Sequence, residues 1–202
     1  MDFAGSRAVP GPAADSAVSS VKIVVGGGFG AGKTTFVGSV SEITPLTTEA
    51  VMTSASDGLD SLLHTPDKTT TTVAMDFGRV TLDAGLVLYL FGTPGQQRFW
   101  FMWDDMIHGA IGAVVLVDTR RLADSFPAVD YFESAELPFI VAVNGFDGDF
   151  PHVIDDVREA LSVSPSVPLI ECDARKRAST KDALMTLVEH ALNLQRGPVG
   201  HY

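Results

Sequence analysis

The sequence is poor in cysteine, in basic residues and in long apolar runs. Its 202 residues include a single cysteine, Cys172, which can form neither an internal disulfide nor a cysteine metal cluster. Lys and Arg number 14 against 25 Asp and Glu, and the formal net charge of −11 argues against a nucleic-acid binder, which needs a positive patch to displace the counterions of phosphates. We therefore expect a cytoplasmic protein that binds no nucleic acid.

Features that would attach the chain to a membrane are also missing. No window reaches the roughly 18 consecutive apolar residues of a membrane-spanning helix, and the first residues lack the basic start and apolar run of a signal peptide. Asp2 excludes N-myristoylation, and the chain ends in Gly200-His201-Tyr202 without a prenylatable cysteine. We expect no direct membrane anchor, so any recruitment to a membrane would go through a partner.

What is present is enough apolar sequence for one domain, since 46% of the residues are hydrophobic. Residues 1–20 are rich in Ala, Gly, Pro and Ser without an apolar period, which predicts a flexible N-terminal tail. Residues 21–194 then form the predicted domain, and residues 195–202 a C-terminal tail. The segment from Glu42 to Thr72 is an unusually long connection, which favours a functional or mobile role.

Within the domain, short apolar runs alternate with amphipathic stretches. The runs predict strands over residues 21–25, 73–82, 86–91, 113–117, 139–143 and 169–172. The stretches predict helices over residues 33–41, 97–107, 125–136, 154–161 and 180–194. This alternation predicts a three-layer α/β sandwich with a mostly parallel six-stranded sheet. Only Asp83-Ala84-Gly85 separates the second and third strands, so these two form an antiparallel edge hairpin.

One motif carries a specific chemistry. Residues Gly27 to Thr34 satisfy G-x-x-x-x-G-K-[ST] between a predicted strand and a predicted helix, which indicates a P-loop for a nucleoside triphosphate with Mg²⁺. Lys33 would reach the β- and γ-phosphates, and the Thr34 hydroxyl would ligate Mg²⁺. The remaining phosphate contacts are expected from the loop and the start of the helix: Gly28, Phe29, Gly30, Ala31, Gly32 and Thr35.

A second segment, Gly92-Thr93-Pro94-Gly95-Gln96, resembles the D-x-x-G-Q motif of Ras-like small GTPases. The resemblance implies the small G-protein version of the P-loop NTPase fold. It also implies that Gly95 donates its backbone N–H to the γ-phosphate and that Gln96 orients the attacking water. The family's aspartate, which holds Mg²⁺ through water, is Gly92 in this sequence, and this departure puts the metal affinity in question.

Upstream, Thr72-Val73-Ala74-Met75-Asp76-Phe77 is similar to the exit of switch I in Arf- and Ras-type proteins. The resemblance makes Thr72 the threonine that closes over Mg²⁺ and the γ-phosphate, with Thr69 to Thr71 as neighbouring candidates for the same register. The alternative is a threonine run that only begins a strand. By resemblance, the catalytic residues are Gln96, Lys33 and Thr72, and the metal ligands are Thr34 and Thr72.

Two later segments resemble the parts of a G protein that recognise the base. Val143-Asn144-Gly145-Phe146-Asp147 is similar to N-K-x-D, in which the aspartate accepts hydrogen bonds from guanine N1 and N2. Glu171-Cys172-Asp173-Ala174-Arg175 resembles E-x-S-A-K, in which the alanine N–H meets guanine O6. The expected base contacts are Asn144, Asp147, Cys172, Asp173 and Ala174, with the Cys172 side chain a buried packing residue. GTP and GDP are therefore the expected ligands.

More narrowly, the switch segments resemble the bacterial Mgl type and the GTP-binding proteins of actinobacterial conservon operons. This implies a signalling switch that works with a Roadblock-type regulator or a GAP- or GEF-like protein and with a sensor-kinase-like protein. A pentapeptide-repeat protein is a further implied partner. We expect slow GTP hydrolysis, because Phe29 would obstruct both Gln96 and an incoming arginine, and Arg79 and Arg98 are only weak internal substitutes.

Two other functions remain open. A pseudo-GTPase would bind nucleotide and partners without useful hydrolysis, which the loss of consensus residues at Gly92 and Gly145 favours. An ATP-using P-loop enzyme would employ Asp118 as a Walker-B carboxylate at the end of an apolar strand. The run from Phe99 to Trp103 holds more large apolar residues than one helix face can bury, which makes it a candidate partner surface with Trp100 and Trp103 as anchors.

Overall fold

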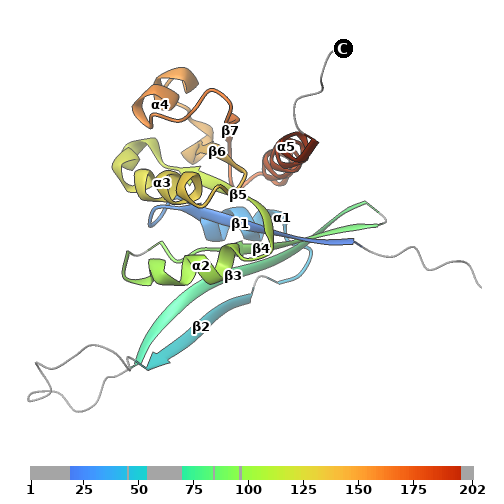
Figure 1. Cartoon of the computed structure of the whole chain (residues 1–202). Helices are drawn as coiled ribbons and strands as arrows, with labels where there is room; N and C mark the ends of the chain where they lie inside the picture. The colour runs from blue at the N-terminus through green and yellow to red at the C-terminus, as the bar shows by residue number, and fades with distance from the viewer. Residues whose placement is uncertain (1–18, 45, 54–69, 84, 96, 197–202) are drawn as a thin grey trace, which may run out of the picture.

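The computed structural model describes residues 19–44, 46–53, 70–83, 85–95 and 97–196, which fold into one sheet with helices on both faces (Figure 1). The strands are β1 (Ser19–Gly27), β2 (Leu46–Thr53), β3 (Thr70–Asp83), β4 (Leu86–Gly92), β5 (Ala110–Val117), β6 (Phe139–Asn144) and β7 (Leu169–Cys172). The α-helices are α1 (Lys33–Val40), α2 (Trp103–Ile107), α3 (Phe126–Ser134), α4 (Ile154–Ala160) and α5 (Arg177–Arg196). The predicted three-layer α/β fold is confirmed.

The expected tails fall largely outside the described residues, which leave out 1–18 and 197–202. Strand β1 begins at Ser19, two residues before the expected start of the domain, and α5 continues to Arg196.

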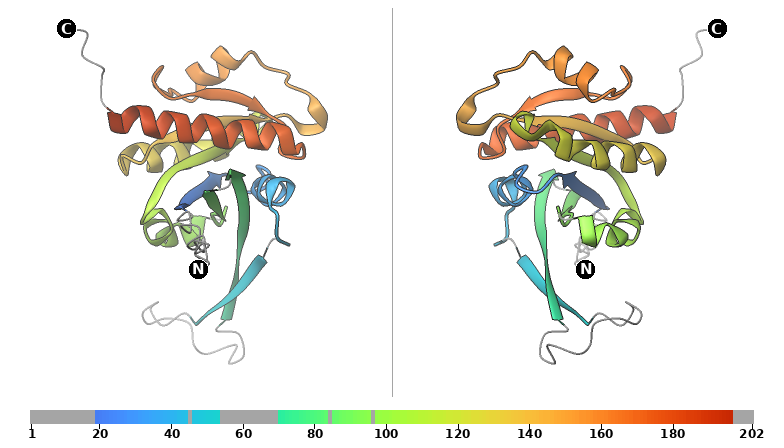
Figure 2. Two further views of the ribbon diagram at one scale, coloured as in Figure 1. Left: turned by 90° about the vertical axis from the view of Figure 1, so that its right-hand side faces the viewer. Right: turned by 90° about the vertical axis from the view of Figure 1, so that its left-hand side faces the viewer.

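The strand order across the sheet is β2-β3-β4-β1-β5-β6-β7. Strand β1 pairs in parallel with β4 and β5, whereas β3 is antiparallel to both β2 and β4. The six predicted strands are all present, and β2 adds a seventh from the segment expected to be a connection. Its threonines and valine favour extended backbone, and it pairs residue by residue with β3 from Leu46 opposite Phe77 to Thr53 opposite Thr70. Strand β2 therefore occupies the edge that was predicted for the β3–β4 hairpin (Figure 2).

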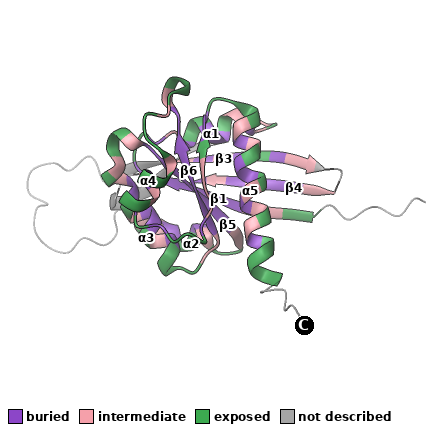
Figure 3. Cartoon of the chain, turned by 90° about the horizontal axis from the view of Figure 1, so that it is seen from above, coloured by how far each residue is buried: buried purple, intermediate pink, exposed green. Residues whose placement is uncertain are grey.

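The two faces of the sheet carry separate cores. Helices α1 and α5 cover one face, where Phe36 and Leu184 pack with Leu88, and α2, α3 and α4 cover the other, where Phe132 packs with Val115. Strand β5 is apolar along its whole length because helices bury both faces of the sheet at this position. Figure 3 shows the middle of the sheet buried, with exposed residues on the outer sides of the helices and at the start of β1.

The predicted helix over residues 97–107 begins as a 3₁₀ turn, Gln97–Met102, before α2. Trp103 is 1% exposed and stacks on Phe132 with ring centroids 5.8 Å apart, so its prediction as a partner anchor is wrong. Trp100 is half-buried against Trp103, whereas Phe101 is 61% exposed. The helix is too short to bury every aromatic ring of this segment, and the ring it leaves in solvent belongs to Phe101.

Candidate nucleotide-binding site

The carboxyl ends of β1, β5, β6 and β7 lie at the same edge of the sheet, because these strands run in parallel. This is the edge at which open α/β sheets bind ligands. Segments far apart in the sequence meet there: the P-loop after β1, Asp118 after β5, Asn144 at the end of β6 and Asp173 after β7.

The P-loop makes the turn from β1 into α1. Gly32 adopts a φ of 104°, which L side chains rarely adopt. A Cβ atom on Gly32 would lie 2.5 Å from Nδ2 of Asn144. The glycine at this position is therefore required both by the backbone conformation and by the approach of the loop after β6.

Lys33 lies inside the loop that precedes it. Its ammonium group donates hydrogen bonds to the carbonyl oxygens of Gly27 at 2.8 Å and Gly28 at 2.7 Å, and the residue is 8% exposed. Burial lowers the pKa of Lys33 to about 8, while the nearby Asp76 carboxylate acts in the opposite direction. The cation is thus fixed at the start of α1, where the helix dipole also favours an anion.

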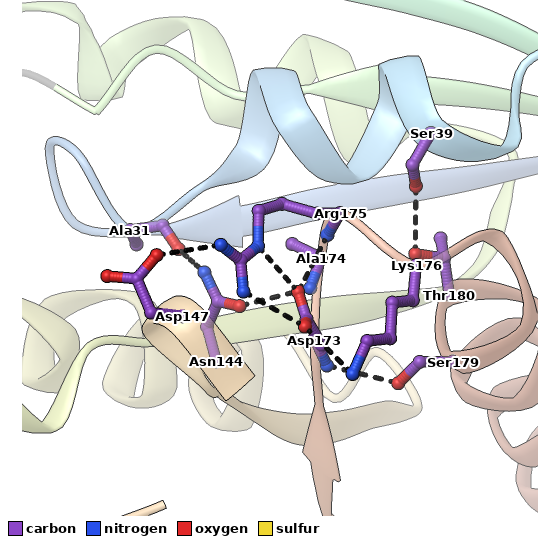
Figure 4. Close-up of polar contacts among 10 residues, drawn as sticks. All are labelled: Ala31, Ser39, Asn144, Asp147, Asp173, Ala174, Arg175, Lys176, Ser179 and Thr180. Carbon is purple, nitrogen blue, oxygen red and sulfur yellow. Dashed lines mark hydrogen bonds and ion pairs between the residues drawn. The ribbon is translucent and has the colours of Figure 1, made fainter. Parts of the chain in front are cut away.

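Asn144 joins three loops through its amide group. Its Nδ2 donates to the carbonyl oxygen of Ala31 at 3.0 Å, and its Oδ1 accepts from the backbone N–H of Ala174 at 3.1 Å (Figure 4). The residue is buried. These two bonds fix the P-loop, the end of β6 and the loop after β7 relative to one another.

Beside this junction, Arg175 forms ion pairs with the exposed Asp147 and the buried Asp173. Arg175 donates from Nη1 to Asp147 at 2.8 Å and from Nε to Asp173 at 3.0 Å, so that it lies between the two carboxylates (Figure 4). Hydrogen bonds from Arg175 lower the pKa of Asp173 to about 2, with Lys176 adding to the effect. From the sequence alone, Arg175 was assigned no role. A basic residue close to acidic residues of two loops nevertheless indicates an ion pair that joins those loops.

A pocket lies between these loops. It is lined by Gly32, Thr35, Asn144, Gly145, Phe146, Asp147, Ala174 and Arg175, and its cavity volume is about 180 Å³. Five of the residues predicted to contact nucleotide therefore surround one space: Gly32, Thr35, Asn144, Asp147 and Ala174. Asp173 is buried beside it and holds Arg175, whereas the Cys172 side chain is fully buried in the core, where burial raises the pKa of its thiol.

Gly145 stands where the resemblance expects a lysine, and an aromatic ring takes the space. A Cβ atom on Gly145 would lie 2.3 Å from the ring of Phe150. Beside it, the Arg120 guanidinium lies 3.6 Å from the centre of the Phe146 ring, within cation–π range. Aromatic rings therefore lie beside Gly145: Phe150 against the glycine itself, and Phe146 in the lining of the pocket.

The Asp118 carboxylate is engaged by Arg120. Arg120 donates to both of its carboxylate oxygens, from Nε at 2.9 Å and from Nη2 at 2.8 Å, and these hydrogen bonds lower the pKa of Asp118. A carboxylate held in this bidentate way is not free to serve as the Walker-B group of the ATP-using alternative.

Gly95, from the segment compared above with D-x-x-G-Q, packs against the P-loop. A Cβ atom on Gly95 would lie 2.9 Å from Nζ of Lys33 and 2.9 Å from Cα of Phe29, so only glycine fits between them. The Phe29 side chain is 62% exposed. Gln96 lies outside the described residues.

Thr72 lies within β3, where its backbone pairs with Val51 of β2, and its side chain is outside the described part of the chain. Arg79 is exposed on the same strand and pairs with Tyr89, and the Arg98 side chain is also outside the described part. The structure therefore gives Thr72 a strand position and leaves its role as a metal ligand a prediction.

One residue of this site escaped sequence reasoning, although it lies inside the segment compared with switch I. The Thr34 hydroxyl donates to Oδ2 of Asp76 at 2.7 Å. Asp76 is 8% exposed and stands directly opposite Gly92 in the pairing of β3 with β4. A hydrophobic alternation broken by an acidic residue within a buried strand is the signal that could have revealed it.

Comparison with known families places this geometry among nucleotide-binding proteins. Residues 25–194 match the family described as "Conserved hypothetical ATP binding protein". The chain belongs to this family. The matched range includes the P-loop, Asp76, Asn144 and Ala174.

Solved structures confirm the fold of this family member as that of a G domain. The G domain of the T. maritima FeoB iron transporter superposes with a TM-score of 0.59 at 16% identity, covering 86% of this chain and 99% of that one. The FeoB G domain of Methanococcus jannaschii gives a TM-score of 0.57 at 13% identity, covering 87% and 100%. At these identities the likeness concerns the fold, a P-loop NTPase of the G-domain type.

An uncharacterized protein of Methanocaldococcus jannaschii is 31% identical over 78 residues, or 38% of this chain. The match covers 50% of that relative's own length.

The family fold implies a divalent cation beside the phosphates, and the oxygen atoms present fit one. Thr34 and Asp76 bring a hydroxyl and a carboxylate together, the hard ligands that Mg²⁺ prefers. Among the described residues no group of three or more His, Cys, Asp or Glu side chains could hold a metal ion. In the same part of the chain, no helix has the length and apolar character to cross a membrane.

Proposed function

We propose that this protein is a GTP-binding molecular switch with slow intrinsic hydrolysis. The observation that carries the proposal is the convergence of the P-loop, Asp147 and Ala174 on one pocket, with the Asn144 amide bonded to Ala31 of the P-loop and to the backbone N–H of Ala174. These groups come from three separate segments of the chain, which follow β1, β6 and β7 and which the parallel strands bring to one edge of the sheet.

Guanine is the base that fits this set of groups. Its N1–H and N2 amino group are donors, which a carboxylate at position 147 can accept, whereas adenine presents an acceptor at N1. The Asp147 side chain is 94% exposed and shares one oxygen, Oδ1, with Arg175. Since exposed ion pairs contribute little, a base entering the pocket can compete for the carboxylate.

Hydrolysis needs a positioned water, for which Gln96 is the proposed residue, while Lys33 holds the phosphates and Gly95 abuts the same loop. The chemistry that bound Mg²⁺ supplies is the neutralisation of charge on the β- and γ-phosphates. The Phe29 side chain is 62% exposed within the loop, and an exposed ring there would obstruct an arginine supplied by a regulator. We therefore propose a site that retains GTP better than it hydrolyses it.

Base recognition is tested by competition of GDP and ADP for the purified protein and for Asp147→Asn. We expect GDP to bind the wild type more tightly than ADP, and we expect Asp147→Asn to lose GDP affinity by about 2 kcal/mol, or roughly 30-fold, because amide for carboxylate removes a charge-assisted acceptor. Asp149→Asn, which changes a neighbouring exposed carboxylate, is the control. Tighter binding of ADP by the wild type would reject guanine specificity.

The description of the family favours a second candidate, an ATP-binding enzyme. The competition with ADP addresses it, as does identification of the nucleotide that co-purifies with the protein. The engagement of Asp118 by Arg120 speaks against a Walker-B role.

The pseudo-GTPase alternative concerns hydrolysis alone. GTP turnover of the wild type is compared with that of Gln96→Leu, with and without cell extract. Equal rates in all four measurements would leave only a nucleotide-sensitive binding module. If cell extract stimulates GTP turnover by the wild type but not by Gln96→Leu, the result would support the switch. The proposed partner in the extract is then a Roadblock-type or other regulator.

A further inference from the structure

Asp76 and Gly92 lie directly opposite each other on neighbouring strands of the sheet. Side chains opposite one another in an antiparallel pair project from the same face. A Cβ atom on Gly92 would lie 3.0 Å from Cβ of Asp76 and 3.1 Å from its Oδ2. The Asp76 carboxylate therefore fills the space in which a side chain at position 92 would stand.

The same carboxylate orients a residue of the P-loop. A hydroxyl has one hydrogen to donate and two lone pairs, so Thr34, by donating to Asp76 at 2.7 Å, keeps both lone pairs for a cation. Within the described part of the chain this is the one hydrogen bond to the Asp76 side chain, and Asp76 is 8% exposed. The Lys33 ammonium lies near enough to Asp76 for the two charges to interact, and Mg²⁺ would bring a second cation to this buried carboxylate.

We propose that Asp76 supplies the metal-site carboxylate that the second switch segment lacks at Gly92, and that it holds Mg²⁺ together with Thr34 and the phosphates of the nucleotide. The proposal rests on nucleotide binding at the P-loop, as proposed above, and does not depend on the base. The proposal explains how a site without the expected aspartate on β4 retains a metal. The carboxylate comes from Asp76 on the neighbouring strand β3 instead. It also explains the glycine, because a larger residue at position 92 would displace Asp76.

A purely structural role would give a different result. In that case Asp76 would only fasten α1 to β3 through Thr34, and an uncharged residue of the same shape would serve as well. Asp76→Asn keeps an oxygen that can accept from the Thr34 hydroxyl and removes the charge. Its metal affinity therefore separates the two roles.

The experiment measures binding of Mn²⁺, a paramagnetic substitute for Mg²⁺, to the protein–GDP complex by electron paramagnetic resonance. We expect Asp76→Asn to weaken Mn²⁺ binding by about 10- to 100-fold, the usual effect of losing a group that supports a metal site. The GDP affinity measured in EDTA should stay unchanged. Asp118→Asn, which alters another buried carboxylate at this edge, should bind Mn²⁺ like the wild type.

A second variant moves the carboxylate back. Asp76→Gly combined with Gly92→Asp should recover most of the Mn²⁺ affinity that Asp76→Gly alone loses, because the two positions share one space. Gly92→Asp alone places two carboxylates against each other and should lower the melting temperature. Recovery in the double variant is an outcome that a structural role for Asp76 does not produce.

Each result decides between the proposals. Wild-type Mn²⁺ affinity in Asp76→Asn, or loss of it in Asp118→Asn instead, would overturn the assignment of Asp76. If the wild type binds ADP and not GDP, guanine specificity fails and the same series in ADP decides the role of Asp76. If the wild type binds neither nucleotide, the switch function and the metal site are both rejected.

Discussion

The two ends of the candidate site are built in different ways. At the base end, Asn144, Asp147 and Ala174 occupy the positions that short sequence motifs assign to them, and side-chain hydrogen bonds tie their loops together. At the phosphate end, the consensus aspartate is Gly92, and a carboxylate from the opposite strand, Asp76, contacts Thr34 instead. A motif therefore describes a site well when its residues are consecutive, and poorly when the same space can be filled from a neighbouring strand.

The largest expected effect tests the phosphate end through Lys33. Lys33→Ala should weaken GDP binding by about 3 kcal/mol, on the order of 100-fold or more, because the charge-assisted contact to the phosphates is lost. Isothermal titration measures the affinity. Lys22→Ala is the matched control, since that lysine contacts the carbonyl oxygen of His108. Equal losses in both variants would show that Lys33 does not contact the phosphates.

Asn144→Ala should affect both ends together. It leaves the Ala31 carbonyl oxygen and the Ala174 N–H without their partner, which should lower the free energy of unfolding by about 3 kcal/mol. Urea unfolding with and without GDP measures this loss. Ser164→Ala, which removes an exposed hydrogen bond, should change stability little. A stable Asn144→Ala that binds GDP normally would show that the two ends do not depend on this junction.

The pH dependence of binding should reflect the phosphate end alone. In the free protein burial lowers the pKa of Lys33 to about 8, well below the usual range of a lysine, so the residue loses its charge as the pH rises above 8. Bound phosphates favour the charged form, so binding takes up a proton above this pH, and GDP affinity should fall by up to about tenfold per pH unit there. Below pH 8 the lysine is already charged and should contribute no slope.

Titrations between pH 7 and 10 measure this slope. Lys33→Arg provides the comparison, because a guanidinium stays charged over the whole range and its affinity should not fall above pH 8. A parallel fall in both proteins would assign the slope to another group.

The smallest expected effect concerns Arg175 at the base end. Arg175→Ala removes an exposed ion pair to Asp147, so GDP affinity should change by less than about threefold. The melting temperature should fall modestly, because the same change removes the hydrogen bonds from Arg175 to the buried Asp173 carboxylate. A much larger loss of affinity would show that Arg175 contacts the nucleotide itself.

The sequence predicted the fold well because its signals were local. Buried strands such as Ala110–Val117 are apolar throughout, and the P-loop lies between a strand and a helix as its motif requires. Strand β2 was missed because its threonines and glutamate carry no hydrophobic alternation, and it becomes a strand only by pairing with β3. Trp103 was misjudged because burial of a tryptophan depends on the neighbouring helix, here through Phe132.

The sequence alone therefore determined the order of the elements, the P-loop and the residues that follow each parallel strand, since these depend on short-range pattern and backbone conformation. Only the tertiary structure decided which side chains meet across that order. The register of β3 against β4 sets Asp76 opposite Gly92, and the packing of α1 brings Thr34 to the same carboxylate. A pairing shifted by one residue would point Asp76 to the other face of the sheet.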